Sequence, residues 1–403
     1  MSTWKVPLAD VQLGPEEIEA MTAVLKSGWL SMGPKTMEFE DNFAHFLGIE
    51  HAFAVANGTA ALHLACEVLG LKAGEEVLCP ALTFVASANA ILYTGATPVF
   101  VDIEGPHNLN LSAADAERKI TPKTKAIMVV HYGGYPADMD AIIALARKYG
   151  LRIIEDCAHA PGVKYDSRQG PKMVGTLGDI GCFSFFSNKN MTTGEGGMVV
   201  TAADDLAENI KHSRSHGMTT LTWDRHKGHS FGYDVVAKGF NFRLDEIRSA
   251  LGIIQLSRLV EMNARRRGLT RQYWQRLNQL QAIEIPFAEF PGPSAHHLFP
   301  ILLKNGVQRA DFMSAMAAQG IQTSIHYPPI HQFSFYQGLF PPGYDHQLPL
   351  TTDVAAREVT LPLYPLMTTE QLEEVTAAIK GFFAGIWSAH ASPGPSNLLE
   401  KHE

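Results

Sequence analysis

One lysine in a polar, glycine-rich segment is the residue of this sequence best suited to covalent chemistry. Lys189 stands in the run Ser184-Phe-Phe-Ser-Asn-Lys-Asn-Met-Thr-Thr-Gly-Glu-Gly-Gly197, and the apolar run 198–201 follows directly. A lysine in a loop between two strands can reach the carboxyl edge of an α/β sheet, where such folds bind ligands, and can form an imine with an aldehyde. The alternative is an ordinary solvated loop lysine, which is the commoner role for a loop lysine without further context.

An aspartate at the end of an apolar run supplies a second candidate. Ile153 and Ile154 are followed by Glu155 and Asp156, which places a carboxylate where a strand is expected to end. There it could meet a pyridinium nitrogen, and a protonated ring nitrogen makes such a ring an electron sink for a carbanion. A turn or a helix cap is the alternative, and it is the commoner role for an aspartate at a strand end.

The segment Asn57-Gly-Thr-Ala-Ala-Leu62 is a candidate phosphate site. A turn leads there into an apolar helical run through Leu69. Backbone amides and a hydroxyl at a helix N-terminus bind phosphate whatever the net charge of the protein. The alternative is that Thr59 only caps the helix.

In their order along the chain, these motifs resemble those of the DegT/DnrJ/StrS family of pyridoxal-phosphate (PLP)-dependent sugar aminotransferases. The matching stretches run from about residue 5 to residue 385. Those around the candidates above are Gly58-Thr-Ala-Ala-Leu62, Thr83-Phe84, Glu155-Asp-Cys-Ala-His159, and Ser184-x4-Lys189 with Gly194-Glu-Gly-Gly197. The others are Ser27-Gly-Trp29 with Gly33-Pro34, Gly239-Phe-Asn-Phe-Arg243, and His326-Tyr-x-Pro329-x-His331. Such an ordered set is far more specific than any single motif.

The resemblance implies a fold and a role for each matching residue. The fold is the α/β fold type I of PLP-dependent transferases, with a large domain whose mostly parallel sheet is flanked by helices and a smaller C-terminal α+β domain. Lys189 is expected to be the Schiff-base lysine and general base, and Asp156 the partner of the ring nitrogen. Phe84 is expected to stack on the ring, and His159 to lie near the ring hydroxyl, where many relatives have glutamine. The expected phosphate contacts are Gly58, Thr59, Ala60 and Ser184, with Asn241 of the other subunit of a homodimer. The expected substrate or amino-donor contacts are Arg243, His326 and Tyr327; a buried structural histidine and a packed tyrosine are the alternatives for the last two.

The function implied is transfer of an amino group, with L-glutamate as donor, to a keto-sugar of a nucleoside diphosphate by a ping-pong reaction. A ketocyclitol acceptor remains an alternative, as does a regulatory protein that holds PLP without turnover. Lys189 argues against the related dehydratases, which carry histidine at this position. The scattered cysteines argue against an iron-sulfur branch, and no metal site is expected.

Apolar runs alternate with helical patterns between residues 50 and 200, which indicates an α/β sheet with crossover helices. Strands are expected at 77–79, 98–101, 126–131, 151–156 and 197–201, with a crossover helix at 137–149. A long helix is expected at 245–280, where Arg258 interrupts the apolar stripe, and a strand at 298–303 and helices at 309–319 and 369–383 follow. We therefore expect a large domain over 1–245, a connector helix and small domain over 246–387, and a mobile polar tail over 388–403.

Composition limits the partners and the location. The 403 residues include 33 Lys and Arg and 41 Asp and Glu, for a net charge of -8. Such a balance provides no basic field for nucleic acid or anionic lipid. The four cysteines form no C-x-x-C pair, and no leader or membrane span is evident. We expect a cytoplasmic enzyme that acts on small molecules.

Overall fold

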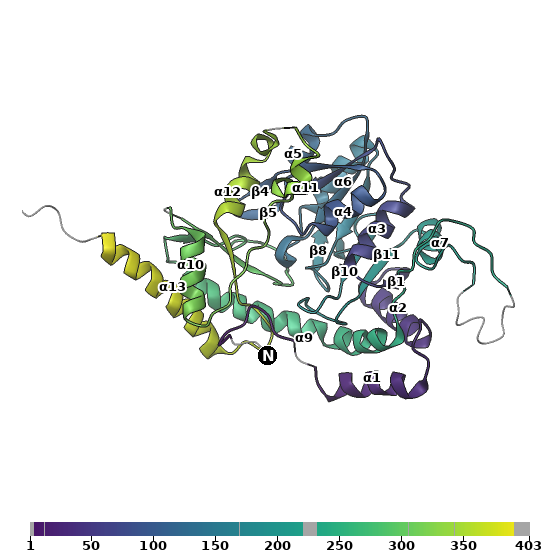
Figure 1. Ribbon diagram of the computed structural model, residues 1–403, viewed down its shortest axis with the longest axis horizontal. Helices are drawn as coiled ribbons and strands as arrows, with labels where there is room; N and C mark the ends of the chain where they lie inside the picture. The colour runs from purple at the N-terminus through teal and green to yellow at the C-terminus, as the bar shows by residue number, and fades with distance from the viewer. Residues whose placement is uncertain are drawn as a thin grey trace, which may run out of the picture.

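The computed structural model describes residues 4–11, 13–168, 170–220, 232–304, 306–341 and 343–390. A seven-stranded sheet forms its centre, in the order β1-β11-β10-β7-β6-β2-β3 (Figure 1). Only β11 runs antiparallel to its neighbours, and the other adjacent pairs are parallel. The strands are β1 (His51–Val55), β2 (Glu76–Pro80), β3 (Thr97–Val101), β6 (Thr124–Val130), β7 (Arg152–Asp156), β10 (Ile180–Ser184) and β11 (Gly197–Thr201). This arrangement confirms the predicted mostly parallel sheet.

Helices cover both faces of the sheet, so most residues of its central strands are buried instead of alternating between buried and exposed. One face packs against α3 (Gly58–Val68), α4 (Ala86–Tyr93) and α7 (Asp204–Ser213). The other packs against α2 (Pro34–Leu47), α5 (Ala113–Arg118), α6 (Met139–Tyr149) and the first half of α9 (Glu246–Leu277). Helix α6 begins with Asp138 as N-cap and ends at Gly150, whose φ of 67° a side chain would strain.

A second core lies around a three-stranded antiparallel sheet, β12-β13-β14. Its strands are β12 (Ile283–Glu284), β13 (Phe299–Leu303) and β14 (Glu358–Leu361), and its helices are α10 (Arg309–Ala318) and α13 (Thr369–His390). Helix α13 extends seven residues past the predicted end at Phe383, so residues 388–390 of the predicted tail are helical. The rest of that tail lies outside the described residues.

Two segments cross the predicted domain division. Val6 of the N-terminal segment packs into the small core. In return, Ile330, Tyr336 and Leu348 of the C-terminal region pack into the core of the large sheet. These contacts hold the chain around residues 326–330 against the carboxyl edge of that sheet.

Helix α9 joins the two cores in one continuous run of 32 residues (Figure 1). Asp245 caps it by accepting a hydrogen bond from the Arg248 amide. Arg258, where the apolar stripe breaks, lies within the helix, and its guanidinium pairs with Glu16 and Glu17 of α1 (Pro15–Ser27). Sequence periodicity thus located this helix to within three residues at its C-terminal end.

The remaining elements are peripheral. They are β4 (Ile103–Gly105), β5 (Asn108–Leu111), β8 (Lys164–Ser167), β9 (Gly170–Met173), α11 (Ser334–Gln337), α12 (Pro349–Arg357) and the 3₁₀ turns η1 (Tyr132–Gly134), η2 (Ile330–Gln332) and η3 (Tyr344–Gln347). None of the helices in the described part of the chain is both long and apolar enough to cross a lipid bilayer.

Candidate active site

A cavity of about 440 Å³ opens at the carboxyl edge of the large sheet. Loops that follow β1, β2, β7 and β10 form its walls, together with the segment around residues 326–327. Parallel strands bring the ends of distant sequence segments to one edge, which is where α/β sheets bind ligands. Nine of the predicted site residues line the cavity: Gly58, Thr59, Phe84, Asp156, His159, Ser184, Lys189, His326 and Tyr327.

Asp156 is the last residue of β7, and its carboxylate is held by two donors. Its Oδ2 accepts a hydrogen bond of 2.9 Å from the Ser87 hydroxyl, and its Oδ1 accepts one of 3.1 Å from the Ala158 amide. Burial raises the pKa of Asp156, while these bonds and the charge of Lys189 act in the opposite direction. A buried, oriented carboxylate of this kind would be stabilised by a cation bound in the cavity.

Lys189 follows β10 in the loop that returns as β11. Its amine has no hydrogen-bond or ion-pair partner among the described residues. Burial lowers the pKa of Lys189 to about 8, and the nearby Asp156 opposes this shift. The neutral, nucleophilic form of the amine is therefore more abundant near neutral pH than for a solvated lysine.

Asn190 anchors the lysine loop, and sequence reasoning did not find it. Its Nδ2 donates to Asn263 Oδ1 (2.7 Å) and to the Ala295 carbonyl (2.8 Å), and its Oδ1 lies 2.8 Å from His297 Nδ1. All of its polar atoms are thus bonded to groups at least 73 residues away along the chain. No local pattern in the sequence could have indicated these partners.

The N-terminus of α3 supplies free amides next to Ser184. Asn57, and not Thr59, caps this helix, because Asn57 Oδ1 accepts a hydrogen bond of 2.8 Å from the Ala60 amide. The amides of Gly58 and Thr59 have no partner in the described structure, whereas that of Ala60 is engaged by the cap. A Cβ on Gly58 would lie 2.7 Å from Ser184 Cβ, so only glycine allows this close approach. The free amides of Gly58 and Thr59, next to the Ser184 side chain, therefore form a suitable site for a phosphate group.

His159 presents a defined tautomer to the cavity. The Gly133 amide donates to its Nδ1 at 3.3 Å, and its Nε2 lies 3.0 Å from the Tyr327 hydroxyl. Burial, with the charge of Lys189 adding to it, lowers the pKa of His159 well below its usual range. Because a backbone N–H can only donate, the ring proton is on Nε2 and is donated to Tyr327.

Phe84 is largely exposed on the cavity wall, with its ring centroid 6.0 Å from that of Tyr327. The exposed ring is therefore available for contact with a bound group.

Asn241 and Arg243 do not line the cavity of their own chain. Asn241 forms an isolated bridge with Ser215, and Arg243 forms one with Val55, the last residue of β1. Burial and the neighbouring Arg214 lower the pKa of Arg243.

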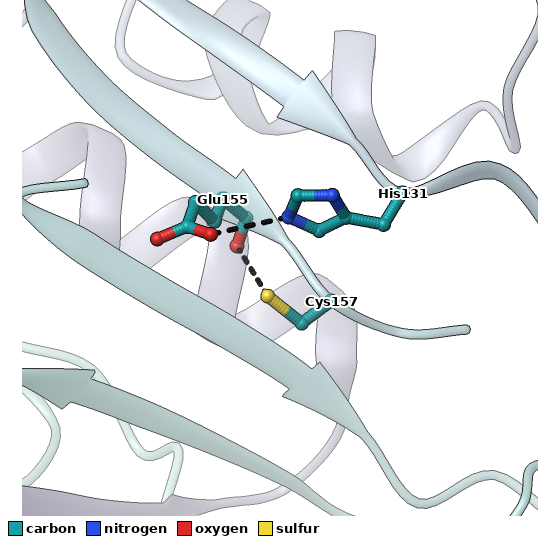
Figure 2. Close-up of side chains that lie close together, drawn as sticks. All are labelled: His131, Glu155 and Cys157. Atoms are coloured by element: carbon teal, nitrogen blue, oxygen red, sulfur yellow. Dashed lines mark hydrogen bonds and ion pairs between the residues drawn. The ribbon is translucent and has the colours of Figure 1, made fainter. Parts of the chain in front are cut away.

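A cluster of His131, Glu155 and Cys157 has side chains of the types that bind metals (Figure 2). Each ring nitrogen of His131 is already bonded, Nδ1 to the Ala137 amide and Nε2 to Glu155 Oε2. The Glu155 carboxylate also accepts three backbone hydrogen bonds, from Gly175, Leu177 and Gly178. These bonds account for the cluster without an ion. Its role is to hold the 175–178 turn beneath β7.

The residues present fit PLP. The free amides of Gly58 and Thr59 can receive its phosphate, and the buried Asp156 can face its ring nitrogen. The unpaired amine of Lys189 can reach its aldehyde carbon.

Comparisons with known proteins agree with this geometry. Residues 11–380 match the model of the DegT/DnrJ/EryC1/StrS aminotransferase family. The chain is 40% identical over 379 residues to the spore coat polysaccharide biosynthesis protein SpsC of Bacillus subtilis, covering 93% of this chain and 96% of SpsC. The structure is similar to Helicobacter pylori PseC, an aminotransferase involved in the biosynthesis of pseudoaminic acid, with a TM-score of 0.87, 30% identity and coverage of 94% and 99%. It is also similar to DesV of S. venezuelae, with a TM-score of 0.86, 34% identity and coverage of 94% and 99%. The chain thus belongs to the DegT/DnrJ/EryC1/StrS family and is a PLP-dependent sugar aminotransferase.

Proposed function

We propose that the enzyme transfers an amino group from L-glutamate to a keto-sugar carried by a nucleoside diphosphate, in two half-reactions, in the cytoplasm. The observation that carries the proposal is the presence of the free amine of Lys189, the buried carboxylate of Asp156 and the open N-terminus of α3 in one cavity. A ketocyclitol acceptor remains the second candidate, because it would require the same amine chemistry.

PLP, when bound, supplies an aldehyde carbon for covalent attachment and a ring that accepts electron density from the carbon bearing the amine. Asp156 holds a proton at the ring nitrogen, and the bonds from Ser87 and Ala158 fix the direction of its carboxylate. The amides of Gly58 and Thr59 and the hydroxyl of Ser184 bind the phosphate.

Lys189 has two tasks in this mechanism. Its neutral amine would hold the cofactor covalently in the resting enzyme. With the donor bound, the same nitrogen would take the proton that leaves the amino carbon of the donor and later give it back. A pKa of about 8 suits both removal and return near neutral pH. The bonds of Asn190 keep the loop in place while the side chain moves.

We further propose a homodimer in which Asn241 of one subunit completes the phosphate site of the other. Support comes from the position of Asn241, which lies outside the cavity of its own chain, on the loop that precedes α9. In the same proposal, Arg243, His326 and Tyr327 contact the substrate or the amino donor.

The test begins with L-glutamate added to the holoenzyme. We expect the visible absorption of the lysine-bound cofactor to shift to that of the aminated cofactor, with release of 2-oxoglutarate. The aminated enzyme is then offered 3-keto and 4-keto nucleotide sugars and a ketocyclitol. Turnover with the ketocyclitol alone would refute the nucleotide-sugar assignment. If L-glutamate causes no change in the absorption of the cofactor, the assignment of L-glutamate as the amino donor is refuted.

A further inference from the structure

A chain of three polar side chains in the small unit ends at the active-site cavity. Glu358 and Thr360 lie on β14 and are buried, and His326 lines the cavity. The Thr360 hydroxyl lies 2.5 Å from Glu358 Oε1 and 3.0 Å from His326 Nδ1. The other carboxyl oxygen, Oε2, accepts a hydrogen bond of 2.9 Å from the His326 backbone amide.

The position of His326 is fixed from several directions. Its carbonyl accepts a hydrogen bond from the Tyr132 hydroxyl. Ser324, two residues earlier, pairs with Thr360 through two backbone hydrogen bonds of 2.8 and 3.2 Å. The ring is therefore held with Nδ1 on the Thr360 hydroxyl, while Nε2 has no partner among the described residues. His326 is thus presented to the cavity through a nitrogen that is free to bind a ligand.

The Thr360 hydroxyl has a single proton and two neighbours, so the two hydrogen bonds are coupled. If Glu358 is ionised, it can only accept, and Thr360 donates to it. His326 must then donate from Nδ1, and its Nε2 carries a lone pair. If Glu358 is protonated on Oε1, it donates to Thr360, and Thr360 donates to Nδ1. The proton of His326 then resides on Nε2.

The surroundings favour the second arrangement near neutral pH. Burial raises the pKa of Glu358 to about 8, although its hydrogen bonds from Thr360 and the His326 amide and the charge of Arg309 act against this. Burial and the charge of Lys189 lower the pKa of His326 to about 4, so its ring stays neutral. The titratable and charged groups that face Glu358 are Arg309, Tyr132, Tyr327 and His326.

We propose that Glu358 acts through the Thr360 hydroxyl to set the tautomer of His326, and thereby whether His326 offers a proton or a lone pair to an oxygen atom of the acceptor sugar. With Glu358 protonated, His326 is an uncharged hydrogen-bond donor to a hydroxyl or carbonyl oxygen. Glu358 and Thr360 are positioning residues, since neither lines the cavity. Only the identity of the ligand rests on the proposed function; the coupling of the three side chains does not.

The test of the coupling is ¹⁵N NMR of the holoenzyme labelled at its histidine side chains. The signals of His326 are assigned by their loss in His326→Gln. A protonated ring nitrogen and an unprotonated one have well separated ¹⁵N shifts, so the spectrum reports the tautomer directly. We expect the proton on Nε2 well below pH 8 and on Nδ1 well above it. A tautomer that stays the same across this range would overturn the proposal.

Three variants separate the steps. Glu358→Gln keeps an acceptor for the His326 amide and gives Thr360 a permanent donor, so the proton should stay on Nε2 at every pH. Thr360→Val removes the hydroxyl that connects Glu358 with His326, so the ring proton of His326 should no longer move between Nε2 and Nδ1 as the pH changes. Thr360→Ser keeps a hydroxyl and should retain the pH-dependent change of tautomer. A variant Thr360→Val that still switches with pH would also refute the relay.

A kinetic measurement tests the contact with the acceptor. With a 4-keto nucleotide sugar, KM of the wild type should rise as pH passes above 8, and this rise should be absent in Glu358→Gln. If NMR shows the change of tautomer but KM does not change over the same pH range, the contact with the acceptor is refuted. Failure of the proposed function would instead appear as no turnover, with the NMR result unchanged.

Discussion

Asp156→Asn removes the negative charge of the carboxylate but keeps its size and its hydrogen bonds, so it tests the charge alone. The asparagine has the same size, and the site can satisfy it: its oxygen can accept from the Ala158 amide, and its NH₂ can donate to Ser87. The Ser87 hydroxyl can then turn to Thr83, whose own hydroxyl lies 3.2 Å away. We therefore expect a change of less than about 1 kcal/mol in the free energy of unfolding, within the range of a conservative substitution that leaves no polar group unpaired.

The effect on the reaction should be much larger. Two unit charges about 4 Å apart interact by about 4 kcal/mol at an effective dielectric constant of about 20. Loss of the anion should remove stabilisation of this size from the protonated ring nitrogen, which corresponds to about three orders of magnitude in rate.

The assay is single-turnover reaction of the PLP-loaded variant with L-glutamate, followed by cofactor absorbance. Ser87→Ala is the matched control, because it removes one hydrogen bond to the carboxylate and keeps the charge. We expect it to lose far less activity than Asp156→Asn. A loss below about tenfold in Asp156→Asn, or about 1.4 kcal/mol, would refute the assigned role of the carboxylate.

Four further outcomes are expected. Lys189→Ala should fold normally but lose both the visible band of the lysine-bound cofactor and turnover; a near-normal rate would end the assignment. Covalent capture of PLP by the apoenzyme should accelerate about tenfold per pH unit until pH approaches 8 and then level off, because only the neutral amine attacks, and stopped-flow absorbance can follow this. Mixed dimers of Asn241→Asp and Lys189→Ala should regain activity that neither homodimer has, since one site then carries both lesions and the other none; no recovery despite proven subunit exchange would place Asn241 in its own chain's site. Asn190→Ala should lower the melting temperature and slow the glutamate half-reaction, since it frees the lysine loop and leaves three buried polar groups unpaired; an unchanged rate in a stable variant would show that the loop needs no anchor.

The features that the sequence predicted well depend on neighbours along the chain. The strands that end at Asp156 and begin at Gly197 are runs of apolar residues whose type does not depend on distant partners. Lys189 was identifiable because a polar, glycine-rich loop interrupts such runs. The long helix was found from its apolar spacing, and its start at Asp245 from the change of pattern.

The features that the sequence did not reveal depend on contacts between distant segments. Asn57 was passed over in favour of Thr59 as the cap of α3, because the choice depends on backbone angles that composition does not set. Asn190 and Glu358 look like ordinary polar residues until folding brings them to Asn263 and His326. The tautomers of the cavity histidines likewise follow from hydrogen-bond partners contributed by distant segments.

Helix α9 fixes the relative positions of three separate parts of the molecule. Glu246 in its first turn accepts hydrogen bonds from the start of α2, Asn263 holds the lysine loop, and Arg266 donates to the carbonyls of His297 and Leu363. One residue added between these points would rotate everything beyond it by about 100° and advance it by about 1.5 Å. Insertions and deletions between residues 246 and 266 should therefore be tolerated far less well than changes in the length of surface loops.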